Sequence, residues 1–245
     1  MKNLVEVKNL KKNYGSKKAV KDISFNIMEN EILGLLGPNG SGKTTTIGML
    51  LGLLKPTDGE ILIDGKKIEE NRIEILQKIN FISPYIELPK KLSVKQNLIV
   101  YGKLYNVKNL KNRIEYLTEK LRLNDLLDRL TGELSSGQKN RASLAKALIN
   151  EPKVLFLDEP TASLDPEIGD YVRTFLENYK KEKKISILLA SHNMNEVTRL
   201  CKSVLMMKEG VIIDKGNPSD LILKHGRQNL EEVFLKLSRN NNEYY

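Results

Sequence analysis

The sequence predicts an α/β fold with a helical insertion in its middle. Short apolar strand patterns are interleaved with helical patterns in the first third of the chain and again after residue 150, which is typical of a sheet covered by helices. Between these parts, residues 93–148 carry apolar side chains at helical spacing. A glycine-rich loop near residue 40 also separates an apolar strand from an apolar helix.

The composition of the 245 residues excludes several protein classes. Hydrophobic residues make up 40% and charged residues 29%, as in an ordinary globular protein. Cys201 is the only cysteine and cannot form an internal disulfide. The longest uncharged apolar stretch, Ile47 to Leu54, is much shorter than the roughly 20 residues that a membrane helix needs. With no apolar signal segment at its start, the chain is expected to be neither secreted nor membrane-spanning.

The chain carries a formal net charge of +9, which by itself is compatible with binding to nucleic acid or to an anionic membrane. The lysines form short separate clusters without interleaved aromatic residues, which favours a solubilising surface. One cluster, Lys180–Lys184, is expected in the segment between a helix and a strand. We therefore expect no nucleic-acid partner.

The expected elements follow from hydrophobic periodicity and from glycine and proline positions. In the first third, Ile23, Phe25 and Ile27 alternate with polar residues as in a half-buried strand, and a turn containing Asp-Gly ends a second strand pattern. The other expected elements are a covered strand over 32–36, helix 44–54, strand 59–65, helices within 93–148, strand 154–157, helix 166–179, strand 186–190, a hairpin around 209–210, and short helices over 218–224 and 230–237.

The glycine-rich loop matches the phosphate-binding pattern G-x-x-x-x-G-K-[ST]. It consists of Gly37, Pro38, Asn39, Gly40, Ser41, Gly42, Lys43 and Thr44. Thr45, which follows it, is expected to be a further nucleotide contact. Glycines let the backbone N–H groups wrap a triphosphate, and the next helix directs its positive end at the same group. Lys43 is expected to bind the β- and γ-phosphates, and the Thr44 hydroxyl to ligate Mg²⁺. A purely structural glycine turn would not need Lys-Thr here, so the loop predicts ATP binding.

Two acidic residues end the apolar run over 154–157. Asp158 is expected to hold Mg²⁺, and Glu159 to position or deprotonate the attacking water. Alone, such a strand end is as often a turn into a loop. After a phosphate-binding loop it indicates a hydrolytic site at the carboxyl end of the sheet.

Three further motifs resemble the nucleotide-binding domain of ABC transporters, and the resemblance covers essentially the whole chain. They are Leu134-Ser135-Ser136-Gly137-Gln138, Ser163-Leu164-Asp165 and Ala190-Ser191-His192. The resemblance implies a P-loop NTPase core with an N-terminal antiparallel β subdomain and an inserted helical subdomain. The implied boundaries are 1–84 and 151–215 for the core, 85–150 for the helical signature subdomain, and 216–245 for a C-terminal helical tail.

The resemblance also implies roles for individual residues in a dimer that sandwiches two ATP molecules. The signature residues Ser135, Ser136, Gly137 and Gln138 would meet the γ-phosphate held by the other subunit. His192 would sense the γ-phosphate, Asp165 would act across the dimer, and Tyr14 would stack on adenine. The simpler interpretations are a helix cap for the signature, a loop residue for His192, a helix start for Asp165, and a core tyrosine for Tyr14.

One position departs from the family pattern. Where the family usually has a glutamine after a short strand, this chain has Pro84, which has no side-chain amide. Either a neighbour such as Tyr85 or Glu87 replaces it, or coupling to the membrane partner is altered.

The C-terminal motifs narrow the expected function. Residues 191–197 and 229–234 resemble the ATPases of ABC-2-type exporters, including multidrug efflux components. The resemblance implies an ATPase subunit that acts as a homodimer or heterodimer at the cytoplasmic face of the membrane. It would drive a separately encoded permease that docks near residues 81–98. The alternatives are a non-transport ABC ATPase acting on ribosomes or nucleic acid, and a regulatory subunit that only binds ATP.

Overall fold

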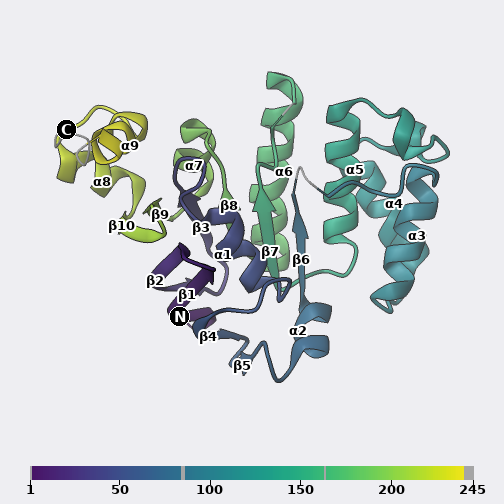
Figure 1. Ribbon diagram of the computed structural model, residues 1–245. Helices are drawn as coiled ribbons and strands as arrows, with labels where there is room; N and C mark the ends of the chain where they lie inside the picture. The colour runs from purple at the N-terminus through teal and green to yellow at the C-terminus, as the bar shows by residue number, and fades with distance from the viewer. Residues whose placement is uncertain (1, 84–85, 163, 240–245) are drawn as a thin grey trace. The chain divides into compact units, whose positions relative to one another are not determined.

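The computed structural model describes residues 2–83, 86–162 and 164–239 (Figure 1). The chain divides into two compact units. The first comprises Met1–Ile75 and Ser186–Tyr245, and the second comprises Leu76–Ile185. The subdomain boundaries implied by the resemblance stay a prediction.

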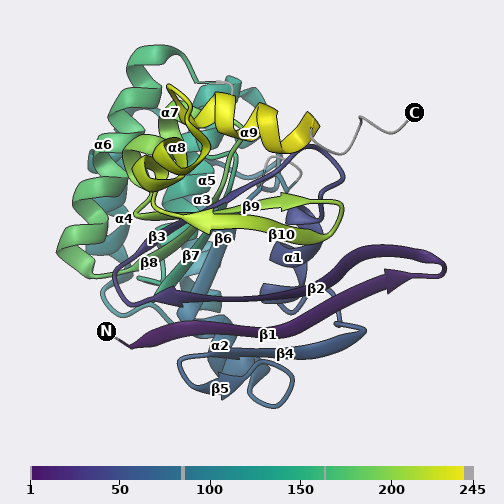
Figure 2. The same ribbon diagram turned by 90° about the vertical axis from the view of Figure 1, so that its left-hand side faces the viewer.

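The first unit contains two sheets (Figure 2). One is antiparallel with strand order β2-β1-β4-β5, and in the other β3 pairs in parallel with β8 and β9 while β10 is antiparallel to β9. The elements are β1 Asn3–Tyr14, β2 Lys17–Met28, β3 Ile32–Leu36, α1 Lys43–Leu50, β4 Asp58–Ile63, β5 Lys66–Lys67, β8 Ser186–Ala190, α7 Met194–Leu200, β9 Ser203–Lys208, β10 Val211–Gly216, α8 Pro218–His225 and α9 Leu230–Arg239. α2 Arg72–Lys78 crosses the boundary to the second unit.

Local sequence explains most of these elements. Every residue of β3 is buried, which confirms the expected covered strand. The turns at Asp64-Gly65 and Glu209-Gly210 have positive φ at both residues, as tight hairpins require. α1 ends at Leu50, four residues earlier than the periodicity predicts, because the chain turns at Gly52 with φ 64°.

The second unit combines two parallel strands with helices (Figure 1). Its further elements are β6 Ile79–Ile82, α3 Val94–Leu104, α4 Leu110–Lys120, 3₁₀ turns η1 Asn124–Leu126 and η2 Thr131–Glu133, α5 Ser136–Leu148, β7 Val154–Asp158 and α6 Pro166–Lys183. The predicted helical insertion and the α/β class are therefore confirmed.

The lysine cluster after residue 179 is not in a connecting segment as expected. α6 continues to Lys183, so that Lys180, Lys181 and Lys183 lie in its last turn and Lys184 ends it with φ 53°. Cations at this end interact favourably with the helix dipole, so these lysines stabilise the helix.

The thiol of Cys201 lies in the interior of the first unit. Cys201 ends α7 and is 7% exposed. A Cβ placed on Gly34 of β3 would lie 3.1 Å from its Sγ. Burial, with smaller contributions from the charges of Glu196 and Glu31, raises the pKa of this thiol.

Within the three described ranges, no helix is both long enough and apolar enough to cross a membrane.

Candidate functional site

The glycine-rich loop connects β3 to α1 in the first unit. It therefore follows the carboxyl end of a strand that has parallel neighbours on both sides, where α/β sheets bind ligands. Gly40 and Gly42 have φ of 81° and 106°, values that residues with a side chain rarely adopt. The strand, loop and helix predicted around the phosphate-binding motif are confirmed.

The loop and the start of α1 present backbone groups that suit an anion. Gly42 is the N-cap of α1 and supplies no side-chain cap to the first N–H groups of the helix. A Cβ built at Gly40 would have no atom within 4 Å, so the backbone there is open. Thr44 is exposed and Thr45 is half-buried in the first turn. These features fit a phosphate chain bound at a helix N-terminus.

The Lys43 side chain bends back over the loop. Its Nζ donates to the carbonyl oxygens of Gly37 at 2.6 Å and Pro38 at 3.2 Å. The cation is therefore held beside the loop amides, where it adds a full charge to the partial charge of the helix end.

An open pocket beside the loop brings Tyr14 and several lysines together with Lys43. Its walls comprise Tyr14, Lys17, Lys18, Ala19, Lys21, Asn39, Gly40, Gly42, Lys43, Thr44, Thr45 and Glu209. Tyr14 is 48% exposed, which excludes the alternative of a core tyrosine, and Lys12 Nζ lies 5.1 Å from the centre of its ring. Lys17 and Lys18 form one of the short lysine clusters that were expected on a solubilising surface. Both lie at the start of β2, just after the turn that follows Tyr14, and Lys17 pairs with Tyr14 across the hairpin. This closeness in sequence to Tyr14 is the signal that could have placed them here.

We expect Gly37→Ala to disable this loop, because the added Cβ would collide with Ser41 Oγ and lie 2.5 Å from the Met207 carbonyl oxygen. The free energy of unfolding should fall by about 1–3 kcal/mol, and ATP affinity should fall with it. Urea unfolding and titration with a fluorescent ATP analogue measure the two effects. Gly216→Ala is the matched control, because its new Cβ would make only ordinary contacts with Leu221. An unchanged ATP affinity would contradict the assignment.

The second unit carries the acidic pair. β7 is buried throughout, and Asp158, its last residue, is 7% exposed. Glu159 is half-buried and has φ 53°, so the chain turns sharply as it leaves the strand. The Ala162 N–H donates to the Glu159 carbonyl oxygen at 3.2 Å. A non-glycine residue with positive φ next to a buried strand end is typical of a functional site.

The signature residues begin α5 in the same unit. Ser135 Oγ accepts from the Gln138 N–H at 3.3 Å, and the Ser135 N–H donates to Gln138 Oε1 at 3.0 Å. This capping box confirms the helix-cap interpretation of these two residues. Ser136 and Gly137 occupy the first helical positions, where free N–H groups favour an anion. Ser136 also lines a pocket with Glu159.

The remaining predicted residues lie at helix and strand ends. Asp165 Oδ1 accepts from the Ile168 N–H at 2.9 Å and caps α6, which confirms the helix-start interpretation. His192 is exposed and follows β8 in the first unit. The roles predicted for Asp165 across a dimer and for His192 at the γ-phosphate stay predictions. Pro84, Tyr85 and Ser163 lie outside the described residues.

In the part of the chain that is described, no three or more His, Cys, Asp or Glu side chains gather where they could hold a metal ion. This does not conflict with the predicted magnesium ligands, because the expected set is one hydroxyl and one carboxylate together with substrate phosphates.

Comparison with known proteins identifies the family. The family model described as "ABC transporter" matches residues 20–162. The chain belongs to the ABC transporter family. Its relatives include the bacitracin transport ATP-binding protein BcrA of Bacillus licheniformis, 37% identical over 94% of this chain and 75% of that protein. Another is the Nod factor export ATP-binding protein I of Paraburkholderia xenovorans (strain LB400), also 37% identical, over 94% of this chain and 76% of that protein.

Solved structures of ABC ATPase domains share the fold. cbiO1 from Clostridium perfringens, described as part of the ABC transporter complex cbiONQ, superposes with a TM-score of 0.80 at 34% identity and 92% coverage of both chains. A dimeric ATP-binding cassette in a post-hydrolysis state with ADP and Pi superposes with a TM-score of 0.81 at 25% identity, covering 87% of this chain and 98% of that chain. The predicted family, fold and ATPase activity are thereby confirmed.

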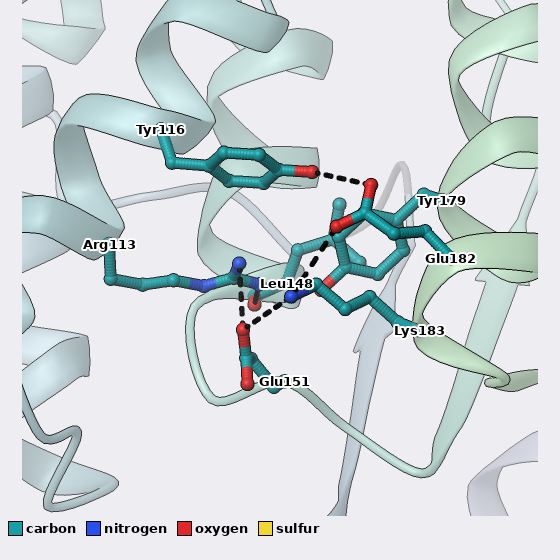
Figure 3. A network of polar contacts seen from close by, with 7 residues as sticks. All are labelled: Arg113, Tyr116, Leu148, Glu151, Tyr179, Glu182 and Lys183. Atoms are coloured by element: carbon teal, nitrogen blue, oxygen red, sulfur yellow. Dashed lines mark hydrogen bonds and ion pairs between the residues drawn. The ribbon is translucent and has the colours of Figure 1, made fainter.

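The structure adds to this ABC domain a polar network around the buried Arg113 that the motifs do not reveal (Figure 3). Arg113 of α4 donates to the carbonyl oxygen of Leu148 at the end of α5 and to the Tyr179 hydroxyl of α6. It also forms an ion pair with Glu151 at 3.1 Å, and Lys183 reaches the same carboxylate at 3.5 Å. One arginine thus ties together α4, the end of the signature helix α5, and α6.

Proposed function

We propose that the chain is the ATP-hydrolysing subunit of an ABC exporter and drives a separately encoded membrane permease. The observation that carries the proposal is the phosphate-binding loop, with an uncapped helix N-terminus behind it, in a chain that also has a signature helix and a buried strand ending in Asp158 and Glu159. The exporter assignment is supported by the relatives, whose names refer to bacitracin transport and Nod factor export.

In this proposal some site residues bind ATP and Mg²⁺, and another accepts the proton of the attacking water. Lys43 and the amides of the loop bind the β- and γ-phosphates of ATP. Thr44 and Asp158 would hold Mg²⁺, which neutralises phosphate charge when bound. Glu159 orients the attacking water and accepts its proton. His192 donates a hydrogen bond to the γ-phosphate and thereby distinguishes ATP from ADP.

The second half of each site comes from another subunit in this proposal. The N–H groups at Ser136 and Gly137 bind the γ-phosphate held by the partner's loop, and Asp165 contacts the partner. ATP thus joins two subunits, either identical or related. The permease docks near residues 81–98, which places the subunit at the cytoplasmic face of the membrane.

Light scattering after size-exclusion chromatography tests the composite site. Glu159→Gln should bind ATP without hydrolysing it and should shift from monomer to dimer only when ATP is present. The double variant Glu159→Gln with Ser136→Arg should still bind ATP but stay monomeric, because the new side chain fills the start of α5.

The alternatives predict different results. A monomer that binds ATP but never dimerises would contradict a homodimer and require a different partner subunit. Tight, salt-sensitive binding of RNA or DNA would favour the non-transport alternative. ATP binding by the wild type without turnover, even with a permease present, would favour a regulatory subunit.

A further inference from the structure

Lys146 is a buried cation in the second unit, and no carboxylate of the described residues is among its contacts. It lies on α5 and is 8% exposed. Its Nζ donates to the Phe81 carbonyl oxygen at 3.0 Å and to Asn80 Oδ1 at 3.5 Å. The same Nζ lies 4.8 Å from the ring centre of Phe81 and 5.5 Å from that of Tyr101. Two neutral oxygens and two aromatic faces therefore surround the charge.

The position of Lys146 links the signature helix to the end of β6. Ser136, Lys139, Asn140 and Ser143 of α5 form one wall of a pocket of about 180 Å³. These residues recur every three or four positions, so they share one helix face, and Lys146 is the next residue on it. The chain that continues from Phe81 supplies Ile82, Ser83, Ile86, Glu87, Leu88 and Lys90 to the other wall. Lys146 thus joins both walls at one end of the pocket.

Attachment of β6 to α5 does not depend on Lys146 alone. Asn80 Nδ2 donates to Asn150 Oδ1 at 2.9 Å, just beyond the end of α5. Asn150 Nδ2 in turn donates to the carbonyl oxygens of Gln77 at 3.0 Å and Ile79 at 3.3 Å. These amide contacts hold the beginning of the strand. Lys146 adds a charge-assisted contact at the other end of β6, where the strand leads into the pocket wall.

A buried cation without a counter-charge is unfavourable for stability. Loss of hydration lowers the pKa of Lys146 to about 8. An apolar side chain of similar length would fill the same space without that penalty. A residue that weakens the fold in this way calls for a role other than packing.

We propose that Lys146 is a positioning residue for ATP hydrolysis, which sets the distance between α5 and the chain leaving β6 and so aligns Ser136 with the pocket that it shares with Glu159. The inference rests on the proposed function, because it assigns Lys146 to the same catalytic cycle. Lys146 itself touches neither nucleotide nor water in this mechanism.

The test compares two substitutions of Lys146. Lys146→Met keeps the length of the side chain but removes its charge and its hydrogen-bond donor, whereas Lys146→Arg keeps the charge and the donor. Lys103→Met, at an exposed site on α3, is the matched control. For Lys146→Met we expect kcat to fall by about 10- to 100-fold, the effect of moving a reacting or positioning group by about 1 Å. The KM for ATP should stay within about twofold of the wild-type value. The urea midpoint of Lys146→Met should rise, and Lys146→Arg should recover most of the kcat.

A second measurement is independent of turnover. Amide hydrogen exchange at residues 79–83 and 136–143 should become faster in Lys146→Met although its global stability rises. An unchanged kcat with unchanged exchange, or a fall in kcat that accompanies a lower urea midpoint, would overturn the proposal. Failure of the wild type to hydrolyse ATP would instead contradict the proposed function. The exchange rates would then still show whether Lys146 holds α5 against the chain leaving β6.

Discussion

Glu159→Gln will remove nearly all ATP turnover while ATP binding survives. The substitution keeps the size of the side chain and its ability to hydrogen-bond to water, but the amide cannot accept a proton at neutral pH. General-base catalysis contributes about 10²- to 10⁴-fold, and we expect kcat to fall within this range. ATP affinity should change little, because the proposed binding groups are Lys43 and the loop amides, which lie in the first unit.

The measurement is phosphate release under saturating MgATP, with nucleotide binding followed separately on the same preparations. Glu115→Gln is the matched control, because Glu115 is an exposed glutamate on α4 away from the strand end. Substantial hydrolysis by Glu159→Gln would show that another group activates water and would remove Glu159 from its assigned role.

Lys146→Met will stabilise the protein at pH 7. The pKa of Lys146 is about 8 in the folded state against an ordinary value of 10.5. At about 1.4 kcal/mol per pH unit, this difference corresponds to about 3 kcal/mol of unfavourable charge burial. Methionine avoids that penalty and loses the two hydrogen bonds to Phe81 and Asn80, each worth about 1 kcal/mol. The free energy of unfolding should therefore rise by about 1 kcal/mol.

The sign of the pH dependence follows from proton binding. Between pH 8 and 10.5 the unfolded chain still holds the Lys146 proton, whereas the folded chain has released it. The free energy of unfolding of the wild type therefore rises with pH in this range. The advantage of Lys146→Met should be greatest below pH 8 and should shrink toward pH 10. Urea unfolding of the wild type and of Lys146→Met at pH 7 and at pH 9.5 measures this difference in the free energy of unfolding at each pH. Lys103→Met should show no such trend, and an advantage that does not shrink would contradict the buried charge.

Local patterns predicted the parts of the fold and site that depend on neighbouring residues. The phosphate-binding loop needs only glycines at fixed spacing between a buried strand and a helix. The caps at Ser135 and Asp165 depend on residues three positions apart. In each case the chemistry lies within a few residues of sequence, so spacing alone is informative.

Periodicity does not reveal β1, although the strand has 12 residues. Its pairing with β2 shifts register at several points, and Asn9 in its middle has φ 48°. Such irregularities break the alternation of apolar and polar residues by which strands are predicted. The strand is therefore determined by its partners, whose positions follow from the assembled sheet.

Buried cations are the other feature that sequence pattern misses. Arg113 and Lys146 are each 8% exposed, yet their residue types predict a solvated surface. Lys146 does have a local signal, since it interrupts an otherwise apolar stretch of α5 between Ala145 and Ala147. The partners of Arg113 include Leu148, Glu151 and Tyr179, which are distant from it in sequence. Only the folded chain brings these groups together.

The environment of Cys201 makes the native chain a suitable background for site-directed labelling. Its thiolate is the reactive form, and both burial and the raised pKa keep its population low. Maleimide spin labels and fluorophores should therefore not react with Cys201 in the folded protein. A cysteine introduced at an exposed position, such as Lys103, would carry the probe alone. In the dimer proposed above, distances between protomers could thus be followed through the ATP cycle without first replacing the natural thiol.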